Sequence, residues 1–133
     1  MKFLVLNGPN LNLLGKREPG VYGTGTYAGL CAEIAAYAAA RGIRADIRQS
    51  NHEGVLIDEI QAADGVYDGI VINPGAYTHY SYAIYDALLA VRVPAVEVHI
   101  SDISRREAFR RTSVTAPACR GQIVGHGFRG YLE

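Results

Sequence analysis

Lys2-Phe3-Leu4-Val5-Leu6-Asn7-Gly8-Pro9 is the stretch that decides the fold, because a short apolar run ends abruptly at Gly8-Pro9. A run of this length bounded by a Gly-Pro pair is typical of a buried strand and too short for a signal peptide. A helical pattern at residues 26–41 and a second apolar run at 43–49 follow it. Strand, helix and strand in this order predict two parallel strands joined by a crossover helix.

The same alternation continues to the end of the chain and predicts the α/β class. The expected strands are residues 3–7, 43–49, 69–72, 95–99 and 122–125. The expected helices are residues 26–41, 53–63, 79–91 and 104–111. Such short crossovers favour a flavodoxin-like, three-layer α/β/α arrangement with a five-stranded parallel sheet in the order 2-1-3-4-5. Ligands of such folds bind at the carboxyl ends of the strands.

Composition limits the classes of function. With 133 residues, of which 49% are hydrophobic and 20% charged, we expect one ordered domain over residues 1–133. A formal net charge of +0 gives no global field that would attract nucleic acid or a membrane surface. Cys31 and Cys119 have no zinc-ligand spacing, and we interpret both as buried apolar residues of a cytoplasmic protein.

A segment rich in Gly and Pro follows the first strand, and we expect residues 16–25 to form a loop that moves as a lid. Arg17 and Tyr22 lie on it. A tyrosine is a poor base near neutrality, but a neighbouring guanidinium favours the phenolate. The pair could therefore form a base, although both side chains could equally be ordinary solvated loop residues.

The carboxyl ends of the third and fourth strands carry polar side chains. Asn73 and His79 flank a turn after the third strand, where an amide and an imidazole can bind hydroxyl groups. His79 alone could also serve a structural role at a helix start. Glu97 and His99 are two residues apart, so Glu97 can orient the His99 ring for proton transfer, or merely satisfy a buried histidine. Ser101 continues this alternation, which raises the hypothesis of a Ser/His/Glu hydrolase. The G-x-S-x-G nucleophile elbow of such enzymes is missing, however.

Two further segments give weaker indications of a role at the site. The expected helix at 104–111 carries four arginines, of which one can turn inward and the others stay solvated. The chain from 125 to 130 has too many glycines for regular structure, and His126 within it is expected at the surface. Tyr80, Tyr82 and Tyr85 are expected in the core or in a subunit interface.

Five blocks of sequence together have a specific likeness. They are residues 10–23 (NLNLLGKREPGVYG), 49–54 (QSNHEG), 73–79 (NPGAYTH), 96–101 (VEVHIS) and 121–131 (GQIVGHGFRGY). In this order the blocks cover nearly the whole chain, which resembles the type II 3-dehydroquinate dehydratases. The resemblance implies a lyase of the shikimate pathway, and thus of chorismate and aromatic amino acid biosynthesis. The expected reaction is dehydration of 3-dehydroquinate to 3-dehydroshikimate by anti elimination through an enolate, with no metal and no cofactor.

The resemblance also implies roles for the catalytic residues. Tyr22, as phenolate, would remove the proton alpha to the ketone, and Arg17 would keep Tyr22 charged. Asn10 would help to hold a water that stabilises the enolate oxygen. His99, oriented by Glu97, would protonate the departing hydroxyl. Removal of such a proton requires a base and oxyanion stabilisation, and loss of hydroxide requires an acid, which agrees with these types of residue.

The remaining implied contacts concern binding and assembly. Asn73, His79 and Arg110 would bind substrate hydroxyls, and the backbone at Ile100 and Ser101 would receive the carboxylate.

Members of the family assemble as dodecamers of four trimers, and Asp86 matches a position that reaches into a neighbouring subunit's site. We expect the family's usual C-terminal helix to be absent from this chain, unless the sequence is truncated, and loss of that helix could weaken the assembly. Tyr85 and His126 depart from the family's pattern, which bears on the interface rather than on the chemistry.

Three other classes of protein fit less well. A flavodoxin-like module that binds a small molecule without catalysis remains the alternative, but an FMN carrier would have its phosphate loop directly after the first strand. A phosphoacceptor domain would have acidic residues at the strand ends, where Asn7, Asn10 and Asn73 stand instead. A nucleic-acid module would need a basic surface.

Overall fold

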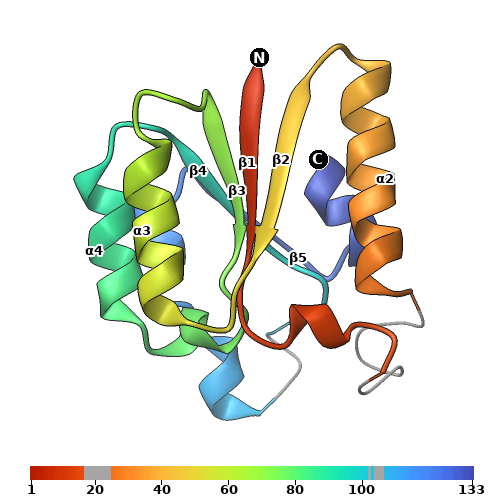
Figure 1. The fold of residues 1–133 in the computed structure, drawn as a ribbon. Helices are drawn as coiled ribbons and strands as arrows, with labels where there is room; N and C mark the ends of the chain where they lie inside the picture. Colours follow the sequence, from red (N-terminus) through yellow and green to blue (C-terminus); the bar gives the residue numbers. More distant parts are fainter. Residues whose placement is uncertain (17–24, 102, 104–106) are drawn as a thin grey trace.

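The computed structural model describes residues 1–16, 25–101, 103 and 107–133. Its five strands form one parallel sheet in the order β2-β1-β3-β4-β5, which confirms the predicted class, topology and order (Figure 1). The strands are β1 (Lys2–Asn7), β2 (Arg44–Gln49), β3 (Gly69–Asn73), β4 (Ala95–His99) and β5 (Gly121–Val124). The α-helices of the described chain are α2 (Tyr27–Ala40), α3 (Glu53–Ala63) and α4 (Tyr82–Ala90).

Alternating residues of the strands divide the core into two layers. Leu4 and Leu6 of β1 pack with α3 and α4 on one face, whereas Val5 packs with Leu30 and Ile34 of α2 on the other. Figure 1 shows α3 and α4 together on one side of the sheet and α2 with the C-terminal end on the opposite side. The two apolar layers fix the strands, and so the edge at which they end.

Short 3-10 helices lie in the connections between the main elements and after the last strand. They are η1 (Leu11–Leu13), η2 (Gly75–His79), η4 (Ala108–Arg111), η5 (Ala116–Ala118) and η6 (Gly127–Leu132). η1 and η2 follow the carboxyl ends of β1 and β3, so they lie at the edge where ligands are expected.

A glycine allows the ends of β1 and β3 to approach closely. Gly8 donates its N–H to the Asn73 carbonyl at 2.7 Å. A Cβ at Gly8 would lie 2.4 Å from the Pro74 carbonyl oxygen, so a larger residue would push the two strand ends apart. The register pairs Asn7 with Asn73, which places two asparagine side chains side by side at the carboxyl edge.

Two helix predictions were partly wrong. The expected helix at 79–91 begins three residues later, because Pro74 and Gly75, with φ 62°, lead into η2, and Ser81 then caps α4 by accepting from the Ile84 N–H. In the expected helix at 104–111, residues 104–106 lie outside the described residues, and 108–111 form one 3-10 turn.

The prediction that residues 125–130 lack regular structure was also wrong, since they lead into η6. The reason is anchoring by main-chain bonds: Gly125 donates to the carbonyls of His99 and Ser101, and Gly127 donates to that of Ile100. His126 is exposed, as predicted.

Several predictions from the sequence concern the burial of cysteine and tyrosine side chains. Cys31 and Cys119 are free thiols and only partly buried, so the prediction that both are buried was wrong. Tyr80 and Tyr82 are 60% and 66% exposed, so they do not belong to this chain's core, and an interface role remains a prediction. Within the described residues, no helix has the length and apolar character that a membrane crossing requires.

Candidate active site

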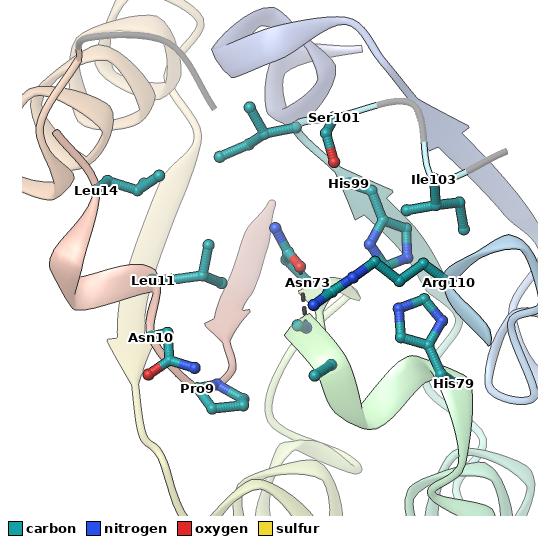
Figure 2. A pocket seen from close by; sticks show the side chains of 13 residues that line it. Pro9, Asn10, Leu11, Leu14, Asn73, His79, His99, Ser101, Ile103 and Arg110 are labelled. Carbon is teal, nitrogen blue, oxygen red and sulfur yellow. Dashed lines mark hydrogen bonds between the residues drawn. The ribbon is translucent and has the colours of Figure 1, made fainter. Parts of the chain in front are cut away.

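A cavity of about 110 Å³ lies at the carboxyl ends of β1, β3 and β4. It brings together seven of the residues singled out from the sequence: Asn10, Asn73, His79, His99, Ile100, Ser101 and Arg110. The other lining residues are Pro9, Leu11, Leu14, Gly75, Ala76 and Ile103. Figure 2 shows the histidines, Asn73 and Arg110 converging on this space from different elements.

His99 and Glu97 form a buried pair at the end of β4. The His99 ring nitrogen Nε2 lies 3.0 Å from the Glu97 carboxylate, and the two residues are 5% and 0% exposed. Burial raises the pKa of Glu97, but the hydrogen bond and charge of His99 and the hydroxyls of Thr115 and Ser113 lower it further, so that the net pKa lies below its usual range. Glu97 is therefore an anion that holds one ring nitrogen of His99.

Asn73 is held in place by two hydrogen bonds. Its side-chain oxygen accepts from the Gly75 N–H at 3.1 Å, and its amide nitrogen donates to the Tyr131 hydroxyl at 2.9 Å. Tyr131 in turn donates to the side-chain oxygen of Asn7 at 2.7 Å. Burial raises the pKa of Tyr131 more than the Asn73 bond lowers it, so Tyr131 stays a neutral phenol.

His79 and Arg110 form the wall opposite Asn10. His79 Nδ1 lies 2.8 Å from the Thr112 carbonyl, so Nδ1 carries the hydrogen and Nε2 is left as an acceptor in the neutral ring. Burial and the charges of His99 and Arg110 lower the pKa of His79, outweighing the Thr112 bond, which raises it. Arg110 pairs with Glu107 and reaches the cavity.

Asn10 lies at the start of η1 in the left-handed region, with φ 67°. Asparagine tolerates this conformation better than most residues do. The Asn10 N–H donates to the Asn51 side chain at 3.0 Å, which anchors the turn and leaves the Asn10 side chain at the cavity.

Not every predicted site residue lies at the cavity. Arg17, Tyr22 and most of the expected lid at 16–25 lie outside the described residues. Glu97 is behind His99 rather than on the lining. Asp86 is exposed on α4 and does not line the cavity of its own chain.

Sequence reasoning missed the residues that support the site: Tyr131, Ser113, Thr115 and Gln122. For Tyr131 the signal was its place at the end of the glycine-rich block. For Ser113 and Thr115 it was a run of small polar residues on a non-helical segment, and for Gln122 its place on the last strand, in register with Glu97. Among the described residues, no three His, Cys, Asp or Glu side chains are grouped so as to hold a metal ion.

The fold and the cavity define an α/β protein of flavodoxin-like topology with a polar, two-histidine site at the carboxyl edge of its sheet. The sequence pattern of the family described as dehydroquinase class II matches residues 1–133. The chain belongs to this family.

Similar proteins agree with this membership. A 3-dehydroquinate dehydratase of Clostridium acetobutylicum is 59% identical over 132 residues, which are 99% of this chain and 92% of the relative. The crystal structure of a type II dehydroquinase from Butyrivibrio crossotus is 56% identical with a TM-score of 0.98, covering 99% of this chain and 92% of that one. A type II dehydroquinase from Propionibacterium acnes is 44% identical with a TM-score of 0.94, covering 98% and 90%.

Proposed function

We propose that this chain dehydrates 3-dehydroquinate to 3-dehydroshikimate, as a hydro-lyase of the shikimate pathway, by anti elimination through an enolate. The observation that carries the proposal is the buried Glu97–His99 pair at a cavity that Asn73, His79 and Arg110 also line, in a chain of this family. A cavity lined by amides, imidazoles and a guanidinium suits a small polyhydroxylated carboxylate.

The first step removes the hydrogen alpha to the ketone. Tyr22, as phenolate, takes this proton, and Arg17 keeps the phenolate charged because a nearby cation favours the ionised form. The electron pair of the C–H bond moves to the ketone oxygen, and Asn10 helps to hold a water that stabilises the resulting enolate. This part of the proposal rests on the family resemblance for Arg17 and Tyr22, and on the position of Asn10 at the cavity.

The second step expels the hydroxyl group. The enolate re-forms the ketone, the C–O bond breaks, and protonated His99 gives its Nδ1 proton to the leaving oxygen, so that water departs. Anionic Glu97 supports this step, since it stabilises the imidazolium through Nε2–H and directs Nδ1 away from itself. The product is a conjugated enone.

The other polar groups hold the substrate. Asn73, His79 and Arg110 bind its hydroxyls, since each presents a polar group at the cavity. The backbone at Ile100 and Ser101 receives the carboxylate, where the bend after β4 is fixed by bonds from Gly127 and Gly125 to the two carbonyls.

We also propose that the chain acts in the cytoplasm, as a dodecamer of four trimers in which Asp86 reaches a neighbouring subunit's site. The exposed position of Asp86 on α4, outside its own cavity, supports this arrangement. Exposed Tyr80 and Tyr82 near the start of α4 provide apolar surface for such contacts.

An ultraviolet assay tests the function, because the enone product absorbs and the substrate does not. The parent should give an absorbance gain with 3-dehydroquinate, whether or not a metal chelator is present. Tyr22→Phe should lower turnover at least about 100-fold while substrate still binds, as loss of a general base does. Binding of 3-dehydroquinate without any absorbance gain in the parent would favour a binding module without catalysis.

A further inference from the structure

The segment from Thr112 to Thr115 contacts His79 and the Glu97 carboxylate that holds His99, although it lines no part of the cavity. The Thr112 carbonyl accepts from His79, and the Val114 N–H donates to the Thr78 carbonyl at 2.7 Å. Ser113 and Thr115 each carry a hydroxyl group, and both side chains turn toward Glu97.

From residues that the structure describes, the Glu97 carboxylate accepts four hydrogen bonds. Ser113 Oγ and Gln122 Nε2 each lie 2.8 Å from Oε2, which His99 also contacts, and Thr115 binds Oε1. Both carboxylate oxygens are therefore fixed, so the plane of the carboxylate cannot rotate away from the His99 ring.

The hydrogens of this network can be assigned by counting. Each hydroxyl has one hydrogen, and those of Ser113 and Thr115 are used on Glu97, which as an anion only accepts. Thr78 Oγ1 lies 2.7 Å from both hydroxyls, so Thr78 must donate to one of them. The hydroxyl hydrogens of this network therefore point toward Glu97. Because the Glu97 anion can only accept, His99 must present Nε2–H to it.

We propose that Ser113 and Thr115 are positioning residues for the proton donor. By fixing both oxygens of Glu97, they hold the His99 ring with Nε2–H toward Glu97 and Nδ1 toward the cavity. The role in turnover rests on the proposed function, but the state of the ring does not.

The test uses the full chain with ¹⁵N in its histidine rings only, and solid-state ¹⁵N NMR, which reports the tautomer of a neutral ring in an assembly of any size. His99→Gln identifies the His99 signals. Without substrate, and at a pH where the His99 ring is neutral, Nε2 of the parent should carry the hydrogen. In Thr115→Val, Oε1 of Glu97 loses its donor and the carboxylate gains freedom to rotate, so the Nε2 signal of His99 should shift from its parental position, and turnover should fall about tenfold, the loss of one hydrogen bond to a charged group, with KM changed less than twofold. Thr115→Ser should restore the parental His99 signals and the parental turnover.

Thr112→Val is the matched control, because it makes the same substitution on an exposed residue and keeps the backbone carbonyl that His79 uses. It should leave the His99 ring signals as in the parent. Ser113→Ala repeats the test at the second donor if Thr115→Val does not fold. Unchanged His99 signals and turnover in a folded Thr115→Val or Ser113→Ala would overturn the proposal. A change of the His99 signals in Thr115→Val, in a protein whose parent does not turn over 3-dehydroquinate, would instead uphold the positioning role and reject the function.

Discussion

The two walls of the cavity are built in different ways. The β4 wall is buried: His99 and Glu97 are almost without exposure, and His99 Nε2 and the Glu97 carboxylate have their partners inside the chain. The opposite wall begins at Asn10, an exposed residue held by its backbone in a left-handed turn. The proton donor is thus oriented before any ligand arrives, whereas the amide of Asn10 has more freedom.

This difference follows from where each wall lies in the fold. A strand interior fixes side-chain direction through packing on both faces, while a turn fixes the backbone and leaves the side chain in solvent. Substitutions in the β4 wall should therefore cost turnover and stability together, and those at Asn10 should separate the two.

Glu97→Gln should have the largest effect. The amide keeps one acceptor oxygen for a site with four donors, and its NH₂ group opposes the donors that remain. Turnover in the ultraviolet assay should fall about 100-fold, within the usual range for a general acid that has lost its support. Glu59→Gln, which removes a partly exposed carboxylate of α3 that pairs with Arg48 of β2 and does not line the cavity, should keep parental turnover.

Acid should weaken the same wall. Because the folded state lowers the pKa of Glu97, its carboxylate adds stability that is fully present above the ordinary value of 4.5 and is lost as pH falls through the folded value. The difference in Tm between the parent and Glu97→Gln should therefore shrink as pH falls below 4.5. A difference that grows on acidification would mean that Glu97 is protonated in the native state.

Tyr131→Phe should have an intermediate effect. Tyr131 orients Asn73, which lines the cavity between the two walls. It leaves the Asn73 amide and the Asn7 oxygen without their buried partner, at a cost of about 1–3 kcal/mol in the free energy of unfolding. Because Asn73 loses its orientation, KM for 3-dehydroquinate should rise more than turnover falls. Tyr67→Phe is the control, since Tyr67 donates to Asp46 away from the cavity and its loss should leave KM unchanged.

Substitution of Asn10 should have the smallest effect on stability. It should also separate a loss of turnover most clearly from a loss of stability. Asn10→Gly keeps the backbone conformation at φ 67° and removes only the amide, so turnover should fall while chemical denaturation is nearly unchanged. Asn10→Ala removes the same amide and adds backbone strain of about 1 kcal/mol. Equal stability of the two variants would show that the left-handed turn imposes no constraint.

The sequence predicted the parts of the molecule that obey simple periodicity. Five strands, their order and the Glu97–His99 pair followed from alternation and from where parallel strands end. It did not predict η2, because Pro74 and Gly75 shape a turn that only packing selects, nor the donors on Ser113 and Thr115, whose segment has no period. The link from Tyr131 to Asn7 joins residues 124 positions apart, and no local pattern encodes it.

The most direct test of the central claim, that His99 is the acid of a stepwise elimination, is deuterium exchange in His99→Ala. In D₂O with 3-dehydroquinate, the variant should exchange the hydrogen alpha to the ketone, seen by proton NMR, while it forms almost no enone. Enone formation at the parental rate would contradict the account, as would a complete lack of exchange while the substrate remains bound.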